Sequence, residues 1–252
     1  MRHLLAAEQR DVLARLGRSK VLIAFDFDGT LASIVAERSR AALRPNTARL
    51  LTRLCAHYPC AVISGRSRAD VAVRLAGAPV KYAVGNHGLE PGSDLGLFQE
   101  MVARNRPIIE VALAGHAGLD IEDKRYSLAV HYRRSPAKRA ARAAILRSVA
   151  ALPIAMRIVP GKLVLNVVPQ GAPNKGDALL ELREREGAEM AFYVGDDVTD
   201  EDVFRLEEPG RLLTVRVGPS ASSAARYFLR DQGEIDALLT RLVEVRRGAV
   251  AS

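Results

Sequence analysis

The sequence has 252 residues, of which 48% are hydrophobic and 26% charged, as in an ordinary globular protein of one or two domains. No apolar run approaches the ~20 residues of a membrane-spanning helix, so we expect no association with a membrane. Residues 1–18 are helix-like but lack the apolar stretch and small-residue cleavage site of a secretory signal, which predicts a cytoplasmic protein.

The formal net charge of +8 indicates an anionic partner. A basic chain can bind nucleic acid, or it can attract a phosphorylated small molecule. Its arginines are dispersed, there are 6 Tyr, 6 Phe and no Trp, and no nucleic-acid recognition motif accompanies them. We therefore expect a small-molecule phosphate and no nucleic acid as the partner; the oligomeric state is left open, with a monomer favoured.

The stretch 21–30 combines a strand with two carboxylates. Residues 21–25 are apolar and have the length of a short buried strand. Asp26 and Asp28 follow, and in an extended chain residues i and i+2 face the same side, so both can reach one site. Two carboxylates so close repel each other unless a cation lies between them, and Mg²⁺ meets that need. An Asp-rich turn with Gly29 at positive φ is the alternative at this point.

Helix-like and strand-like segments alternate along the next part of the chain. They are a helix over 45–57, a strand over 61–63 ending at Ser64, a helix from about 67 and a strand over 81–84. This alternation predicts a parallel sheet with helices on both faces. Ligands of such sheets bind beyond the carboxyl ends of the strands, which is where the polar residues occur here.

The middle of the chain has a different pattern. Residues 126–133 and 162–168 alternate between apolar and polar, as half-exposed strands do. Ser135 and Pro136 are a typical helix start, and the helix is expected to run to about residue 152. A small open sheet backed by helices follows from this pattern. We expect an inserted α+β domain at 104–167, with the core formed by 1–103 and 168–252.

The first pattern resumes after residue 168. A helix over 178–186, a buried strand over 191–194 that ends on an acidic run, a strand over 212–217 and a helix over 231–245 are expected. Gly187 is expected to terminate the first of these helices. The predicted fold class is therefore α/β, with a Rossmann-like parallel sheet, helices on both of its faces, and the inserted α+β domain.

Five side chains in four separate stretches suggest one reaction. They are Asp26 and Asp28, Ser64, Lys175 and Asp196, in that order along the chain. Phosphoryl transfer needs a nucleophile, a cation against the phosphate oxygens, donors to those oxygens and a proton for the leaving group. An aspartate can be the nucleophile and form an aspartyl-phosphate. The set supplies every part, so the sequence predicts a phosphatase.

The order DxDGT, strand followed by Ser, Lys and GDDxxD resembles the haloacid dehalogenase superfamily of aspartyl-phosphate phosphatases. Within it, residues 85–90, 122–124, 131–133 and 195–202 resemble the trehalose-6-phosphate phosphatases, and the likeness covers about 21–218. The resemblance implies a Mg²⁺-dependent phosphoric monoester hydrolase that converts trehalose 6-phosphate to trehalose and phosphate. It also implies that the inserted domain is a mobile cap that closes over the site.

The resemblance further implies roles for individual residues. Asp26 would be the nucleophile, and Asp28 would protonate the leaving oxygen and then activate water. The catalytic set is Asp26, Asp28, Ser64 and Lys175. The metal set is Asp26, Asp28 through its carbonyl, Asp196 and Asp200, the last by orienting water. The substrate-binding set is Thr30, Arg66, Asn86, His87, Glu122, Lys124, Arg133, Lys162 and Asn166. For Arg66 two interpretations stay open, a contact with the substrate phosphate and a pairing within the core.

One segment departs from the family pattern. Many members carry Gly-Lys-x-Val-x-Glu-x-Arg-Pro, whereas this chain has Asn166 and Val168 in place of Glu and Arg. A missing partner at a buried polar contact costs ~1–3 kcal/mol. Two alternatives therefore stay open. One is a phosphatase of the same mechanism for another sugar phosphate, of the sucrose-phosphate or glycosylglycerate-phosphate type. The other is a non-catalytic basic protein that binds a phosphate or nucleic acid.

Overall fold

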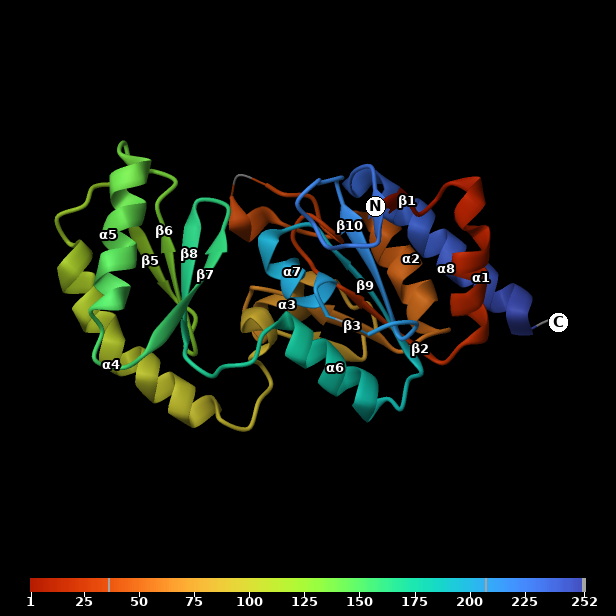
Figure 1. Ribbon diagram of the computed structural model, residues 1–252, viewed down its shortest axis with the longest axis horizontal. Helices are drawn as coiled ribbons and strands as arrows, with labels where there is room; N and C mark the ends of the chain where they lie inside the picture. Colours follow the sequence, from red (N-terminus) through yellow and green to blue (C-terminus); the bar gives the residue numbers. More distant parts are fainter. Residues whose placement is uncertain (36, 207, 251–252) are drawn as a thin grey trace. The chain divides into compact units, whose positions relative to one another are not determined.

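The alternating segments form a parallel sheet in the computed structural model, which describes residues 1–35, 37–206 and 208–250 (Figure 1). Neighbouring strands among these residues pair in parallel throughout this sheet. In spatial order the strands are β1 (Arg2–His3), β11 (Tyr227–Leu229), β10 (Leu212–Val217), β9 (Met190–Gly195), β2 (Val21–Phe25), β3 (Cys60–Ile63) and β4 (Tyr82–Val84). The predicted parallel core is confirmed.

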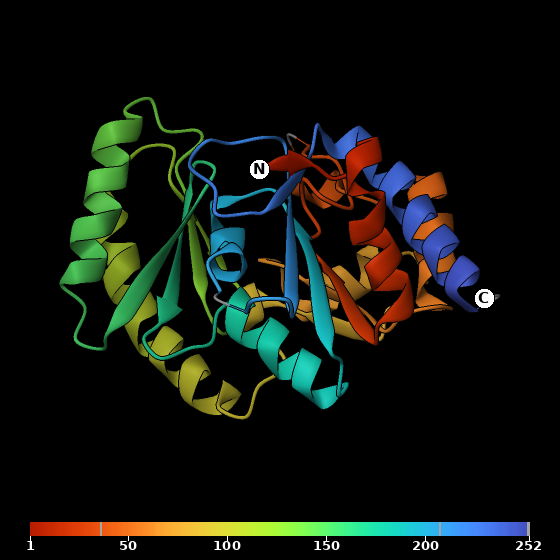
Figure 2. The ribbon, with the colours of Figure 1, turned by 45° about the vertical axis from the view of Figure 1, so that its right-hand side comes forward.

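Helices cover both faces of this sheet, as predicted (Figures 1 and 2). One face carries α1 (Arg10–Arg18), α2 (Pro45–Cys55), α3 (Arg68–Arg74) and α8 (Ile235–Val250), and the other carries α6 (Lys175–Arg185) and α7 (Glu201–Phe204). Because side chains alternate along a strand, β2 serves both layers. Ile23 and Phe25 pack with the first group of helices, and Leu22 and Ala24 with the second.

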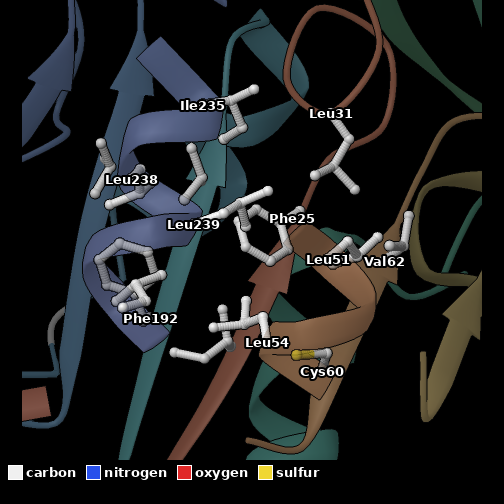
Figure 3. Close-up of a cluster of buried hydrophobic side chains, with 14 of the residues drawn as sticks. Phe25, Leu31, Leu51, Leu54, Cys60, Val62, Phe192, Ile235, Leu238 and Leu239 are labelled. Atoms are coloured by element: carbon white, nitrogen blue, oxygen red, sulfur yellow. The ribbon is translucent and has the colours of Figure 1, made fainter. Parts of the chain in front are cut away.

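The core of the first layer lies between the sheet and two helices from distant parts of the chain (Figure 3). Phe25 of β2 and Phe192 of β9 are fully buried, and they pack in one cluster with Leu51 of α2 and Leu239 of α8. Burial of such side chains contributes roughly 1.5–3 kcal/mol each. This packing fixes the strands whose carboxyl ends carry the polar residues.

A second, antiparallel sheet is built from the middle of the chain. Its strands are β5 (Asp120–Asp123), β6 (Leu128–His131), β8 (Val164–Pro169) and β7 (Met156–Gly161), in that spatial order. One face packs against α4 (Leu95–Leu113) and α5 (Lys138–Ala150), with Val130, Val167, Ile109 and Ile145 in the shared core. This unit has the expected α+β character.

The chain divides into one unit of Met1–Gly88 and Asn174–Ser252, and a second of Leu89–Pro173. The expected boundary at residue 104 instead falls inside α4. The reason is that α4 places Val102 and Ile109 in the core of the second unit, so the whole helix belongs to that unit. Short 3-10 helices complete the described elements, namely η1 (Ala7–Gln9), η2 (Arg38–Arg40), η3 (Asn86–Gly88), η4 (Val198–Asp200) and η5 (Gln232–Glu234). No helix in the described part of the chain is long and apolar enough to cross a membrane.

Candidate active site

Three carboxylates meet at the carboxyl edge of the parallel sheet. Asp26 directly follows β2, and its backbone N–H donates to Val194 O of β9 at 2.8 Å, which joins the two strand ends. Oxygen atoms of Asp26, Asp196 and Asp200 all lie within 4.8 Å of one another. The parallel topology therefore brings together acids that lie about 170 positions apart in the sequence.

Lys175 joins this cluster from the first turn of α6. Its ammonium is buried, with Nζ 2.8 Å from Asp26 Oδ1 and 2.7 Å from Asp200 Oδ1. Asn174 caps the helix by accepting hydrogen bonds from the N–H groups of Gly176 and Asp177. A cation at a helix N-terminus opposes the helix dipole, so the two carboxylates must hold Lys175 there.

Asp200 organises its neighbours through both carboxylate oxygens. Oδ1 accepts from Lys175 and from the Tyr193 hydroxyl at 2.7 Å, and Oδ2 accepts from the backbone N–H groups of Asp196 and Asp197 at 2.8 Å. Each oxygen of Asp200 thus already accepts two hydrogen bonds. Because one of the donors is the backbone N–H of Asp196, Asp200 holds Asp196 in place. Tyr193 was missed by the sequence analysis. A hydroxyl two residues before the end of a buried strand requires a polar partner, and that requirement was the available signal.

The ionisation of the cluster reflects its burial. Burial raises the pKa of Asp26 well above its usual range, although Lys175 opposes this effect. Burial, followed by the charges of Asp200 and Asp197, raises the pKa of Asp196 to about 7. For Lys175, burial alone would lower the pKa, but the charges of Asp200 and Asp26 outweigh burial and raise it. The raised pKa values of Asp26 and Asp196 show that ionising both of these carboxyl groups is unfavourable in the absence of a cation.

The residues present fit a divalent cation. Three carboxylates face one ammonium, which leaves two negative charges when all of them are ionised. Carboxylate oxygens are the ligands that Mg²⁺ prefers. Gly29 permits the close approach of the β2 turn, because its φ is +86° and a Cβ atom there would lie 2.1 Å from Asp196 Oδ2. Thr30 Oγ1 also donates to Asp196 Oδ1, at 3.4 Å.

We expect the metal-free protein to lose stability as the pH rises from about 4 to about 7, between the ordinary and the folded pKa of Asp196. Over this interval the folded chain holds a proton that the unfolded chain has lost, so each step upward in pH disfavours folding. The expected loss is at most about 4 kcal/mol of unfolding free energy, because each unit of pKa corresponds to ~1.4 kcal/mol. Thermal melts with a chelator would show it. Added Mg²⁺ should remove the loss, and Asp196→Asn should reduce it to the part contributed by Asp26; an unchanged slope in Asp196→Asn would contradict the assignment.

Ser64 and Arg66 lie on the loop after β3. Ser64 is buried, and its Oγ accepts from the backbone N–H of Arg66 at 3.2 Å. It does not cap α3, because Ser67 fills that role by accepting from Asp70 N. The Arg66 side chain donates to both oxygens of Asp28, at 2.6 and 2.7 Å, and to Asp70 Oδ2 at 2.7 Å. The structure thus pairs Arg66 with Asp28 and Asp70, whose side chains are 39% and 34% exposed.

The turn after β4 supports this loop. Asn86 and His87 both have positive φ, and their backbone N–H groups donate to Arg66 O at 2.7 Å and to Ser64 O at 2.9 Å. The His87 ring packs against Gly65, where a Cβ atom would lie 2.5 Å from His87 Cε1. Asn86 and His87, which the sequence analysis assigned to substrate, therefore also fix the Ser64–Arg66 loop.

The remaining candidates lie in the second unit. Strand register aligns Glu122, Ala129 and Asn166 in one row across the sheet, on the face opposite α4 and α5. On this face Lys124 Nζ donates to Asn166 Oδ1 at 3.2 Å, and Glu122 Oε2 lies 2.9 Å from His131 Nε2. Sequence and structure therefore agree on a polar face.

Two candidates of the second unit stand apart from that row. Arg133 and Lys162 are exposed, in the segments that follow β6 and β7.

A further basic residue was missed in the first unit. Arg216, in β10, donates to Asp197 O at 3.3 Å and lies beside the loop that carries the acids. Its place in an apolar strand gave no sign of this contact.

Sequence comparisons place the chain among the trehalose-phosphatases. Residues 24–232 match the family model described as trehalose-phosphatase. The trehalose-phosphate phosphatase of Mycobacterium tuberculosis H37Rv is 33% identical over 262 residues, covering 95% of this chain and 67% of that protein. That of Mycobacterium marinum is 31% identical over 259 residues, covering 94% of this chain and 66% of that protein.

Solved structures share the fold. The C-terminal domain of the Candida albicans trehalose-6-phosphate phosphatase superposes with a TM-score of 0.77 at 22% identity, over 93% of this chain and 96% of that one. The trehalose-6-phosphate phosphatase of Aspergillus fumigatus gives a TM-score of 0.65 at 26% identity, over 97% and 99%. The likeness thus extends over both units of the chain.

Proposed function

The chain belongs to the trehalose-phosphatase family, and on this premise we propose that it hydrolyses trehalose 6-phosphate to trehalose and phosphate. The observation that carries the proposal is the cluster of Asp26, Lys175, Asp196 and Asp200, in which all but the partly exposed Asp196 are buried. A buried aspartate beside an ammonium and two further acids is suited to nucleophilic attack on phosphorus. A stabilising role alone would not require three acids in one buried place.

We propose two steps at phosphorus. In the first, an Asp26 oxygen forms a bond to phosphorus while the bond from phosphorus to the sugar oxygen breaks, and Asp28 gives that oxygen a proton. In the second, a water oxygen bonds to phosphorus, the Asp26–phosphorus bond breaks, and Asp28 accepts the proton of the water. Lys175 holds one Asp26 oxygen at 2.8 Å, which leaves the other for the attack. Ser64 is assigned as a donor to the phosphoryl oxygens.

We assign Mg²⁺ as the cation, held by carboxylate oxygens of Asp26 and Asp196 and by the backbone carbonyl of Asp28. Asp200 fixes Asp196 by accepting a hydrogen bond from the backbone N–H of Asp196. When bound, the cation would offset negative charge on the phosphoryl oxygens. The residues of the chain itself then orient the nucleophile and move the proton.

The second unit is assigned as the cap that recognises the sugar. Its polar face carries Glu122, Lys124 and Asn166, whose carboxylate, ammonium and amide groups match the donors and acceptors of sugar hydroxyls. Asn166 replaces the Glu of the family pattern. Its Oδ1 accepts a hydrogen bond from Lys124 Nζ, and its Nδ2 donates to Val159 O, both at 3.2 Å. This observation keeps another sugar phosphate, of the sucrose-phosphate or glycosylglycerate-phosphate type, as the second candidate substrate.

The assignment is tested by measuring phosphate release from a panel of phosphorylated sugars. We expect trehalose 6-phosphate to give a kcat/KM about 10-fold or more above sucrose 6-phosphate, glucosylglycerate phosphate and glucose 6-phosphate. A higher kcat/KM for sucrose 6-phosphate or glucosylglycerate phosphate would transfer the assignment to that compound. Equal turnover of glucose 6-phosphate would reject recognition of a disaccharide.

A further inference from the structure

The side chain of Arg66 is bound to Asp28 in an arrangement that fixes both groups. Nε lies 2.6 Å from Asp28 Oδ2 and Nη2 lies 2.7 Å from Oδ1. The guanidinium therefore holds the carboxylate by two parallel hydrogen bonds, which we call the Arg66 fork. Paired bonds of this kind fix direction as well as distance. Arg66 is buried, whereas the Asp28 side chain is 39% exposed. The buried partner therefore determines where the exposed one lies.

Arg66 is itself held from several directions. Its Nη1 donates to Asp70 Oδ2 at 2.7 Å, and Asp70 Oδ1 in turn accepts from Arg74 Nε at 2.9 Å. Arg74 also donates to the backbone carbonyls of Ser39, at 3.0 Å, and Ala41, at 2.5 Å, in the segment beyond the Asp28 turn. A continuous chain of charged groups thus links Asp28 to α3 and to the segment of Ser39 and Ala41. Arg66, Asp70 and Arg74 each have at least two partners, which holds the guanidinium of Arg66 in place.

From this geometry we infer that Arg66 is a positioning residue, which holds Asp28 ready to accept the proton of the water that hydrolyses the aspartyl-phosphate. The inference rests on the proposed function. Each Asp28 oxygen has a second lone pair beyond the one facing Arg66, so the held carboxylate can still accept a hydrogen bond from water. Displacement of a catalytic group by about 1 Å can cost about 100-fold in rate. Loss of the Arg66 fork should therefore slow the hydrolysis of the aspartyl-phosphate.

This role differs measurably from a contact with the substrate phosphate. A phosphate contact acts before and during formation of the aspartyl-phosphate, so its loss lowers kcat/KM. Positioning for the water step acts only afterwards, so its loss lowers kcat and leaves kcat/KM, which reports steps up to the first irreversible one, nearly unchanged. The aspartyl-phosphate then accumulates.

The test uses 4-nitrophenyl phosphate, whose leaving group needs no proton, and rapid mixing with the full chain and Mg²⁺. For Arg66→Lys we expect kcat to fall about 10- to 100-fold and kcat/KM to change less than about 3-fold. We also expect a burst of 4-nitrophenolate that approaches one equivalent per site. Asp70→Asn, which keeps the fork and removes its support, should show the same pattern to a smaller degree. Arg53→Lys, an exposed position of α2, is the matched control.

Two results would overturn the inference. They are a parallel fall of kcat and kcat/KM without a burst, and kinetics unchanged from those of the wild-type chain. Should Arg66→Lys fail to fold, Asp70→Asn decides by the same criteria. Failure of the proposed substrate is seen separately, because the wild-type chain would then hydrolyse 4-nitrophenyl phosphate but not trehalose 6-phosphate.

Discussion

Asp26→Asn will lower kcat for phosphate release by about 10⁴-fold or more, because the amide that replaces the carboxylate is a poor nucleophile and cannot form the aspartyl-phosphate. The substitution keeps the shape of the side chain, and its amide oxygen can still accept the hydrogen bond from Lys175. It also removes one of three negative charges from a buried cluster. We therefore expect the variant to fold, with a metal-free Tm equal to or above that of the wild-type chain.

The measurement is release of inorganic phosphate from trehalose 6-phosphate and from 4-nitrophenyl phosphate, together with a thermal melt. Asp11→Asn, at an exposed position of α1, is the matched control and should keep full activity. Phosphate release that is undiminished by Asp26→Asn would show that another group attacks phosphorus. A variant that loses activity only because it is unfolded would be recognised by its melt.

The site at the sheet edge could be predicted from the sequence because the carboxyl ends of parallel strands all lie at one edge of the sheet. Once 21–25, 61–63 and 191–194 are parallel strands of one sheet, Asp26, Ser64 and Asp196 must lie at the same edge. Lys175 added a separate signal, since a lysine at a helix start opposes the helix dipole. Its pairing with Asp26 and Asp200 confirms that the position is stabilised by anions.

What could not be predicted depends on partners that local sequence does not identify. The fork between Arg66 and Asp28 joins two loops, and neither residue alone indicates which of its possible partners it meets. Strands β5 and β7 were missed for a related reason. Asp120–Asp123 has three acids in four residues, and Met156–Gly161 ends in Pro-Gly, so neither has the composition of a strand. Pairing with β6 and β8 forms both of them.

Lys175→Met should have the largest effect on stability among the substitutions considered. The ammonium is buried between Asp26 and Asp200, and methionine of similar length keeps the packing but removes the charge. Removal of one partner from a buried ion pair costs about 3–5 kcal/mol, because the other charges are left without compensation. Activity should also fall by about 100- to 1,000-fold, because the free Asp26 oxygen is no longer aimed at phosphorus.

A second variant tests whether uncompensated charge causes the loss of stability. If uncompensated charge causes the loss, Asp200→Asn combined with Lys175→Met should recover part of the unfolding free energy, and Mg²⁺ should stabilise Lys175→Met more than the wild-type chain. Denaturant melts with and without the cation measure both effects, with Lys20→Met, at an exposed position before β2, as the control. Metal-free Lys175→Met as stable as the wild-type chain would mean that Asp26 and Asp200 do not need the ammonium. Uptake of protons by the acids would then have to relieve their repulsion, because three carboxylates cannot remain close together and all ionised without a cation.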